Sequence, residues 1–525
     1  REPKLNWDDV WVQEKSNQHA LLTCFFEHFE ENQSLVFIYA KQVPFVETSG
    51  RVLVGVGRIK RIIPSGEYEG SNSTFASLYW ENMVLHSIRP DSKDGFLLPY
   101  HKALDYQKEH PDFDPAEIAV IVPADKTLEF SFVSEHVGND TAIRMLRACL
   151  HSFQKSKELG VIEDITAQES WIHNELARIE KLRGAYPGLS SALRAFGFEK
   201  GHFLAAEIIN GLKGANACPW EVLEKALVNP AMYLSESTAS CVHESIKDTY
   251  QTLKRTKSQR LKLLHLLSRF DLSYDQAKIL YISSERDSAG ITHNEKDYLQ
   301  NPYLIYEDLI CSIDPVAFDT IDLGMFVEHE GELQPDGICC NDPFDSRRIR
   351  ALTVLQLESA AITGHTLLPH NHIILNLRKL NIKPTCQITE DLFARAETYF
   401  VGKIGIVDLE SDLKACQLDR YMETRRIINT KVEKRISANR LEIDANWRDL
   451  IDQKFGLILD DEQSESETKA RQEKAAALEE MARSRFSVLI GPAGTGKTSL
   501  LSILAEHPDI SSKGILLLAP TGKAR

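Results

Sequence analysis

The pattern of hydrophobic and polar positions changes near residue 140, from a strand-like period to a helical one. Before that point, short apolar runs are separated by turns that carry glycine and serine, a pattern typical of β-strands. The runs that predict strands are Leu35–Tyr39, Arg51–Val56 and Ile118–Val122. We therefore expect residues 1–135 to form a mixed α/β or β-rich domain, whose role nothing in its sequence indicates.

After this point, apolar side chains recur every three or four residues, as on the buried face of an amphipathic helix. The clearest stripes lie within residues 143–153, 171–182, 258–270 and 275–281. Glycine and proline residues break the segments between them. Residues 136–340 are therefore predicted to be mainly helical.

Residues 341–455 are expected to form a smaller mixed domain. Its predicted elements are a helix over Ala351–Ala361, a strand near Ile373–Leu375 and a helix near Tyr421–Arg440. The stretch Asp460–Glu467 is acidic and polar without an apolar period, which is typical of an exposed linker or a loosely held helix start. We place a linker over residues 456–469 and a new domain from residue 470.

The most informative stretch follows in that domain, where Gly491–Thr498 has the pattern G-x-x-x-x-G-K-[ST] of a phosphate-binding loop. Apolar runs at Phe486–Ile490 and Ile515–Ala519 predict buried parallel strands on either side. A helix is expected over Lys497–Glu506 between them. This order of strand, loop, helix and strand is the context in which such a loop binds phosphates.

The residue types in the loop match this chemistry. Glycines allow unusual backbone angles and a close approach of the backbone to phosphate. In this pattern Lys497 reaches the β- and γ-phosphates, and the hydroxyl of Thr498 binds Mg²⁺, so we assign the catalytic role to these two residues. The nucleotide-binding residues are predicted to be Gly491, Pro492, Ala493, Gly494, Thr495, Gly496, Lys497, Thr498 and Ser499.

A second motif, Ala519–Arg525, follows the second predicted strand. Ligands of open parallel sheets bind beyond the carboxyl ends of the strands, and small residues with exposed amides suit a nucleic-acid phosphate there. An ordinary turn before the next helix is an equally good interpretation of these residues.

The two motifs together resemble superfamily 1 DNA helicases of the RecD-like type (similar to the exodeoxyribonuclease V alpha subunit). The resemblance implies that the first motif is a Walker A loop for ATP and Mg²⁺ in a RecA-like domain. It implies that the second motif contacts single-stranded DNA through Thr521, Gly522 and Lys523. It also identifies Gln472 as a candidate to read the adenine edge, with a solvated helical glutamine as the alternative.

Weaker similarity to the N-terminal region of long RecD-like helicases reaches further back. It rests on Asn301–Tyr303, on Asp345–Ala351 and on Gly364–Pro369. The turns at Tyr186–Leu189 and Ala195–Gly197 are similar to helix-hairpin-helix turns. The overall expectation is a multidomain α/β and α protein with a truncated RecA-like P-loop domain at its C-terminus.

The resemblance implies an ATP-dependent DNA helicase or translocase that moves 5′→3′ in DNA repair, recombination or defence. Its partner is expected to be single-stranded or partly duplex DNA. The chain begins with Arg1, not Met, and its last residue is Arg525 of the second motif, so we expect an N-terminal fragment of a larger protein. Hydrolysis also needs a metal-binding acidic residue and an arginine across the cleft, so this fragment alone should bind ATP and hydrolyse almost none.

Composition limits how the protein can contact nucleic acid and where in the cell it is expected. A net charge of −15 argues against a protein that coats nucleic acid by bulk charge, but a local basic channel stays possible. The basic run that includes Arg425, Arg426, Lys431, Lys434, Arg435 and Arg440 is a candidate for DNA or interdomain contact. Nine scattered cysteines without a C-x-x-C pair, and no long apolar run, favour a cytoplasmic protein without membrane contact.

One other class of function fits the loop. A P-loop switch or signalling ATPase would use its nucleotide as a latch, and its N-terminal domains would bind protein partners. The motif at Ala519–Arg525 favours the DNA motor over this alternative.

Overall fold

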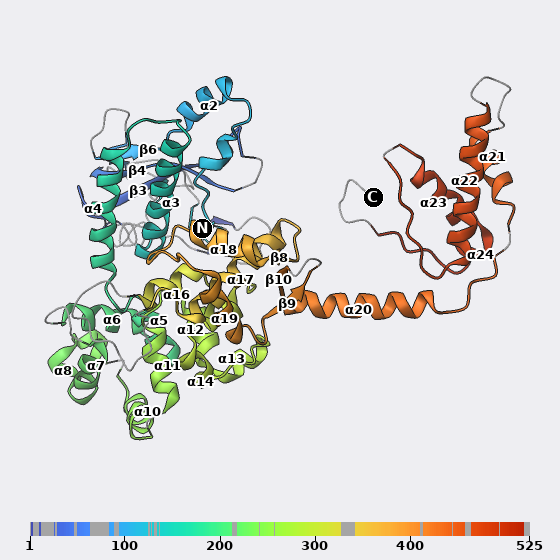
Figure 1. The fold of residues 1–525 in the computed structure, drawn as a ribbon. Helices are drawn as coiled ribbons and strands as arrows, with labels where there is room; N and C mark the ends of the chain where they lie inside the picture. The colour runs from blue at the N-terminus through green and yellow to red at the C-terminus, as the bar shows by residue number, and fades with distance from the viewer. Residues whose placement is uncertain are drawn as a thin grey trace. The chain divides into compact units, whose positions relative to one another are not determined.

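The computed structural model covers residues 1–525, and most of the described residues lie in helices (Figure 1). The residues that it describes are all except 1, 4–9, 12–25, 27–28, 47–49, 64–82, 89–93, 124–125, 128, 131–133, 136, 213–217, 241, 257, 327–341, 410–412, 444, 457–463, 493 and 519–525. The described strands form three small sheets.

The largest sheet lies in the N-terminal part of the chain, and its pairs are all antiparallel. Its order is β5-β4-β3-β7, and β6 also pairs with β4. The strands are β3 (Leu35–Ala40), β4 (Val52–Ile63), β5 (Met83–His86), β6 (Gly95–Leu97) and β7 (Ser134–Glu135), and a separate pair is formed by β1 (Glu2–Pro3) and β2 (Val10–Trp11). The strands predicted at Leu35–Tyr39 and Arg51–Val56 are confirmed by β3 and β4.

The strand predicted over Ile118–Val122 is not formed. Ile118 ends the 3₁₀ helix η2 (Pro115–Ile118), and Ile121 makes only an isolated bridge with Val52. Two backbone hydrogen bonds of 2.8 Å, from Leu53 N to Val120 O and from Val122 N to Arg51 O, hold this segment beside the start of β4. The segment is extended as its apolar residues predict, but the pairing is too short for a strand.

Two long helices pack on the sheet. These are α3 (Asn139–Glu158) and α4 (Thr166–Arg183), and the shorter α2 (Tyr100–Glu109) precedes them. Phe37 and Val56 of the sheet share a core with Ile143 and Leu146 of α3 and with Ile172 of α4. The predicted stripe at 143–153 is therefore confirmed as the buried face of α3. The stripe at 171–182 is confirmed in part, since Leu176 and Ile179 are buried, Trp171 is half-buried and Leu182 is exposed.

A run of helices follows, as the sequence predicts for this region. They are α5 (Leu189–Phe196), α6 (Gly201–Asn210), α7 (Pro219–Val228), α8 (Pro230–Tyr233), α9 (Glu236–Ala239), α10 (Glu244–Arg255), α11 (Gln259–Leu267), α12 (Tyr274–Tyr281), α13 (Ser283–Ser288), α14 (Glu295–Gln300), α15 (Leu304–Leu309) and α16 (Phe318–Met325). Helices α11 and α12 confirm the stripes at 258–270 and 275–281. Serine caps explain where both begin, since Ser258 accepts from Arg260 N and Ser273 from Gln276 N.

The next part of the chain combines helices with a three-stranded sheet of order β8-β10-β9. Its elements are α17 (Ser346–Ile362), β8 (Leu368–Pro369), α18 (His370–Lys379), α19 (Glu390–Ala396), the 3₁₀ helix η4 (Glu397–Tyr399), β9 (Ile404–Asp408) and β10 (Lys414–Leu418). The strand predicted near Ile373–Leu375 is wrong, because these residues lie inside α18. Ile373, Ile374 and Leu377 are its buried residues, and their spacing is that of one helix face.

Buried ion pairs hold α17 in place. The guanidinium of Arg348 makes two hydrogen bonds of 2.8 Å with the carboxylate of Asp322 on α16. The hydroxyl of Tyr303 donates to the same carboxylate at 2.6 Å, and burial raises the pKa of Asp322 above its ordinary value. Arg350 pairs in the same way with Glu307 on α15. The segments Asn301–Tyr303 and Asp345–Ala351, singled out in the sequence, thus contribute to one buried network.

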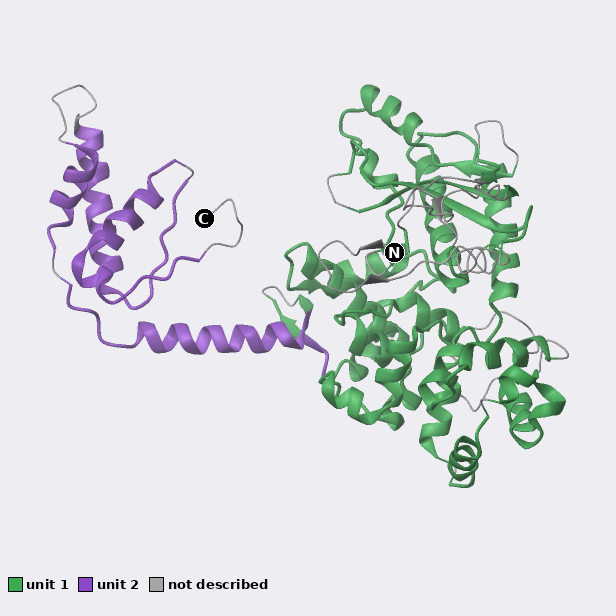
Figure 2. Cartoon of the chain, turned by 180° about the vertical axis from the view of Figure 1, so that it is seen from behind, with its two compact units in different colours: residues 1–401, 406–416 green, residues 402–405, 417–525 purple. Residues whose placement is uncertain are grey.

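Contacts divide the chain into two compact units (Figure 2). The larger contains residues 1–401 and 406–416, and the smaller contains 402–405 and 417–525, so the division runs through β9 and β10. The helices of the smaller unit are α20 (Asp419–Ile436), α21 (Trp447–Phe455), α22 (Ser464–Arg483), α23 (Lys497–Glu506) and α24 (Pro508–Ser511). Helix α20 confirms the helix near Tyr421–Arg440, although it ends earlier. Since α22 begins at Ser464, the linker placed over 456–469 is in part helical.

The finer domain boundaries at residues 135, 340 and 455 stay predictions. Within the described ranges, we find no helix whose length and apolar character would let it cross a bilayer.

We predict that Arg348→Met lowers the free energy of unfolding of the larger unit by about 3–5 kcal/mol, because Asp322 would stay buried without its ion pair. Urea denaturation followed by circular dichroism measures this change. Lys108→Ala is the control, since it removes only an exposed pair with Asp105 and should leave the transition in place. An Arg348→Met transition that coincides with that of the unchanged chain would contradict the role given to this network.

Candidate nucleotide-binding site

The helix that follows the phosphate loop begins and ends where the sequence predicts. Helix α23 spans Lys497–Glu506, and Leu500 and Ile503 are its buried residues. They belong to a small core with Ile451 of α21 and with Leu478 of α22. This packing fixes the axis of α23, and therefore the direction in which its N-terminus points.

The loop backbone has the conformation that its glycines allow. Gly494 and Gly496 have φ angles of +81° and +83°, in the left-handed region that other residues rarely adopt. Gly496 is also the N-cap of α23 and, as a glycine, has no side chain to cap this end of the helix. The first N–H groups of α23 have no partner within the helix, so they are available to an anion.

Lys497 lies over the loop that it is predicted to serve. Its Nζ donates to the carbonyl oxygens of Gly491, at 2.7 Å, and Pro492, at 2.6 Å. The hydroxyl of Thr495 donates to the carbonyl oxygen of Pro492 at 3.0 Å. The ammonium group therefore sits beside the glycine turn with weak, neutral acceptors, which a phosphate oxygen can replace.

The strands predicted on either side of the loop are not formed. Phe486–Ile490 and the described residues of Ile515–Ala519 have no regular secondary structure, and no strand pairs with them in the described part of the chain. Most of their apolar side chains are exposed, with exposed fractions of 69% for Val488, 87% for Ile490 and 80–85% for Leu516, Leu517 and Leu518, whereas Leu489 packs against the small core. A strand needs a neighbouring strand to accept and donate its backbone hydrogen bonds, and an apolar sequence pattern alone does not provide that neighbour. The predicted strand-loop-helix-strand unit is thus present only in its loop and helix.

Of the other predicted site residues, some lie in the described part of the chain and some do not. Thr498 is exposed on the first turn of α23, and Ser499 beside it is half-buried. Ala493 lies outside the described residues, as do Thr521, Gly522 and Lys523 of the second motif. The DNA contact assigned to that motif therefore stays a prediction.

Gln472 is exposed on α22, which packs beside α23. A side chain of α22 that does approach the loop is that of Lys474, whose Nζ lies 3.9 Å from where a Cβ would stand on Gly496. Two residues correspond to about 200° around a helix, so Gln472 does not share this face. The adenine contact proposed for Gln472 stays untested. Nothing in the sequence pattern distinguishes Lys474 from any other lysine on a polar helix, so it was not predicted.

Ion pairs fix α22 on α21. Arg471 is buried and contacts Asp452 at 2.7 Å and Glu467 at 2.8 Å, and it also donates to the carbonyl oxygen of Gly456 at 2.5 Å. Arg448 contacts the other oxygen of Asp452 at 2.8 Å. These contacts hold the pKa of Asp452 below its ordinary value, chiefly through the hydrogen bonds of the two arginines. They orient the helix face that carries Lys474.

Helix α20 carries most of the basic run noted in the sequence. None of its residues is buried. Arg426 forms an ion pair with Glu423 at 2.7 Å, whereas Lys431, Lys434 and Arg435 have no carboxylate partner among the described residues. This helix therefore presents unneutralised positive charge to solvent.

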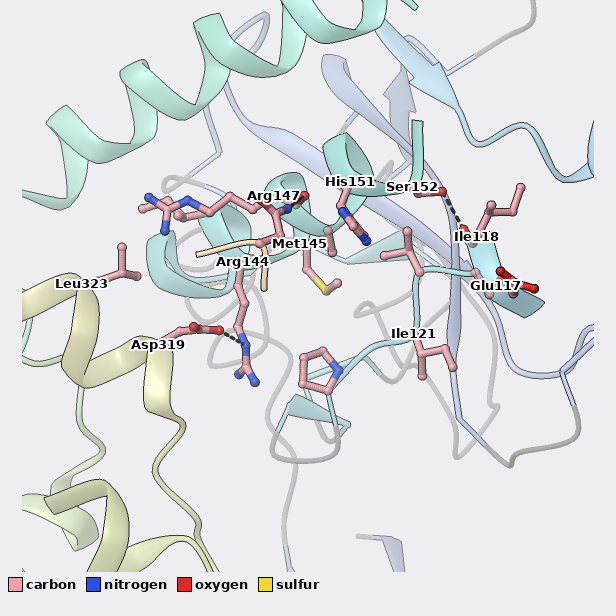
Figure 3. Close-up of a pocket in the computed structure, with 16 residues that line it drawn as sticks. Glu117, Ile118, Ile121, Arg144, Met145, Arg147, His151, Ser152, Asp319 and Leu323 are labelled. Atoms are coloured by element: carbon pink, nitrogen blue, oxygen red, sulfur yellow. Dashed lines mark hydrogen bonds and ion pairs between the residues drawn. The ribbon is translucent and has the colours of Figure 1, made fainter. Parts of the chain in front are cut away.

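The larger unit contains a cavity of about 340 Å³ beside α3. Figure 3 shows Arg144 reaching Asp319, at 2.9 Å, and Ser152 reaching the carbonyl oxygen of Ile118, at 2.6 Å. Arg147 pairs with Glu180 at 3.2 Å. Burial, and then the charge of Lys155, lower the pKa of His151 below its ordinary value. Arg144 and Arg147 are thus both paired with carboxylates of the same unit.

A family model matches the C-terminal part of the chain. Residues 468–525 match the family model of an AAA domain, a helicase-like P-loop family. The chain is also 24% identical, over 546 aligned residues, to an uncharacterized protein of Methanocaldococcus jannaschii. That alignment covers 94% of this chain and 44% of the relative, so the chain spans less than half of the relative's length. No solved structure matches the chain.

We predict that Gly494→Ala weakens the binding of ATP at least about tenfold, or by about 1.4 kcal/mol, because a Cβ in the left-handed region distorts the phosphate cradle. Gly514→Ala is the matched control. Gly514 has a φ of +83°, and at both positions a Cβ would meet no atom within 4 Å. Both variants carry the same backbone strain, so titration with a fluorescent ATP analogue separates strain from a role in the loop. Equal affinities for the two variants would contradict that role.

Proposed function

We propose that this chain is the nucleotide-binding part of an ATP-dependent DNA helicase or translocase of the RecD-like type, with 5′→3′ movement. The observation that carries the proposal is the loop itself. Two glycines in the left-handed region, an uncapped helix start and Lys497 converge at one point. The match of residues 468–525 to a helicase-like P-loop family supports the same class of protein.

The residues of the site fit a nucleoside triphosphate with Mg²⁺. The N–H groups at the start of α23 would hold phosphate oxygens, and Lys497 would exchange its two carbonyl partners for the β- and γ-phosphates. The exposed hydroxyl of Thr498 would hold Mg²⁺, which neutralises charge that develops on the phosphates during hydrolysis. The glycine turn leaves room for this group, since a Cβ at Gly494 would meet nothing within 4 Å.

We also propose that DNA is the partner of the motor. Thr521, Gly522 and Lys523 would contact one strand, as the resemblance to RecD-like helicases implies. Helix α20 offers a second contact, because Arg420, Lys431 and Lys434 are separated by 11 and 3 residues and so fall on one face. Phosphates are the groups that such a row of cations binds without regard to sequence.

Replacing Lys497 tests the nucleotide site. Lys497→Ala should weaken ATP binding at least about tenfold, since it removes the cation that faces the β- and γ-phosphates. In the full-length protein, the same variant should abolish ATP hydrolysis that DNA stimulates. Lys513→Ala, an exposed lysine of the same unit, should change neither quantity. Normal affinity for ATP in Lys497→Ala would refute the assignment.

The dependence on DNA separates the motor from a P-loop latch. If the full-length protein hydrolyses ATP at a rate that neither single-stranded nor partly duplex DNA changes, the helicase proposal fails. A switch or signalling ATPase would then be the better description.

The charge of α20 gives an independent test of the DNA contact. We predict that the double variant Lys431→Gln, Lys434→Gln weakens binding of single-stranded DNA and lowers the slope of log K against log salt by about 1.4, or about 0.7 for each lost phosphate contact. The double variant Arg425→Gln, Arg426→Gln removes the same charge from other faces of the helix and should have less than half of this effect. Fluorescence anisotropy at several salt concentrations measures the slope for each double variant. If the two variants have equal slopes, the face of α20 that carries Lys431 and Lys434 makes no specific contact with DNA.

A further inference from the structure

A second ammonium group stands at the phosphate loop besides that of Lys497. Lys474 extends from α22 so that its Nζ lies 3.9 Å from the position of a Cβ on Gly496. Gly496 is the residue from which α23 starts. Lys474 is therefore located at the end of α23 where its unpaired N–H groups gather.

The packing of α22 explains this position. Leu478 and Ala482 of α22 are buried in the same core as Leu500 and Ile503 of α23. Lys474 precedes Leu478 by four residues, or about one turn, and so continues the face that packs on α23. The ring of Phe455 lies 5.6 Å from the ammonium group and supports it from the side of α21.

The charges around the loop are unbalanced. Lys474 has no ion pair among the described residues, and its neighbours one turn away on α22 are Ala470, Arg471, Ala477 and Leu478. Among the described residues, the hydrogen-bond acceptors of Lys497 are neutral carbonyl oxygens. The N-terminus of α23 adds a positive partial charge to these two cations. The pKa of Glu467, two turns back on α22, is lowered chiefly by the hydrogen bond of that carboxylate with Arg471, and the charge of Lys474 also helps to lower it. Positive groups that converge are stabilised when an anion enters between them.

We propose that Lys474 is a second phosphate-binding cation of the nucleotide site and that it contacts the polyphosphate chain of the bound nucleotide. This inference rests on the proposed function, because it requires a nucleotide in the loop. It adds a residue outside the loop motif, supplied by the preceding helix. The contact is with phosphate and not with the base, so its contribution should follow the number of phosphates.

Lys474→Ala tests the proposal, and Lys469→Ala is the matched control, because Lys469 is an exposed lysine of the same helix. Alanine favours helix at both positions, so neither change should unfold α22. We expect Lys474→Ala to weaken the binding of ATP about tenfold and that of ADP less, with AMP hardly affected. Lys474→Arg should restore most of the affinity, because the charge is kept. Isothermal titration calorimetry with the three nucleotides measures these values.

The outcomes distinguish this inference from the function on which it rests. If Lys497→Ala loses affinity while Lys474→Ala binds ATP as the unchanged chain does, the role of Lys474 is refuted and the nucleotide site stands. If neither variant loses affinity, the nucleotide site itself is refuted. An equal loss for ATP, ADP and AMP would overturn the phosphate contact. A loss of affinity for DNA in the absence of nucleotide would show that Lys474 serves nucleic acid instead.

Discussion

The candidate site depends on one constraint: α23 must start at Lys497 and nowhere earlier. A helix that extended back through the loop would use the N–H groups of its present first turn in its own hydrogen bonds. Gly496, with a φ of +83°, prevents this extension, and the burial of Leu500 and Ile503 holds the helix that remains. The amides, the dipole of α23 and the position of Lys497 all follow from where this helix begins.

In the larger unit, the corresponding constraint is a set of charged side chains that are buried in its core. Arg348 and Arg350 are two residues apart on α17, so they point to different sides of that helix. One pairs with Asp322 on α16 and the other with Glu307 on α15. Buried pairs of this kind add little net stability, because desolvation offsets the attraction. Their consequence is orientation, since α17 cannot rotate without separating a buried charge from its partner.

Sequence alone predicts those parts of the fold that local signals determine. Helix α23 is predicted to the residue, because glycines, a lysine and an apolar face mark its start and its course. The strands at Phe486–Ile490 and Ile515–Ala519 are not, because a strand depends on neighbours that its own residues do not specify. Ile373–Leu375 contains two adjacent isoleucines, which favour strands, yet tertiary packing places them on the buried face of α18. Contacts made across the fold, such as those of Lys474 and Arg348, leave no periodic signal in the sequence.

The acidic composition of the chain does not oppose an anion at the loop. At physiological salt, charges farther than about 8 Å are largely screened, so the net charge of −15 contributes little at the position of a phosphate. The groups that decide binding there are the near ones: the ammonium groups of Lys474 and Lys497 and the first N–H groups of α23. Lys497 must give up two carbonyl partners when it binds, whereas Lys474 has no hydrogen-bonded acceptor among the described residues to lose. Lys474 can therefore bind a phosphate with a smaller loss of existing hydrogen bonds than Lys497.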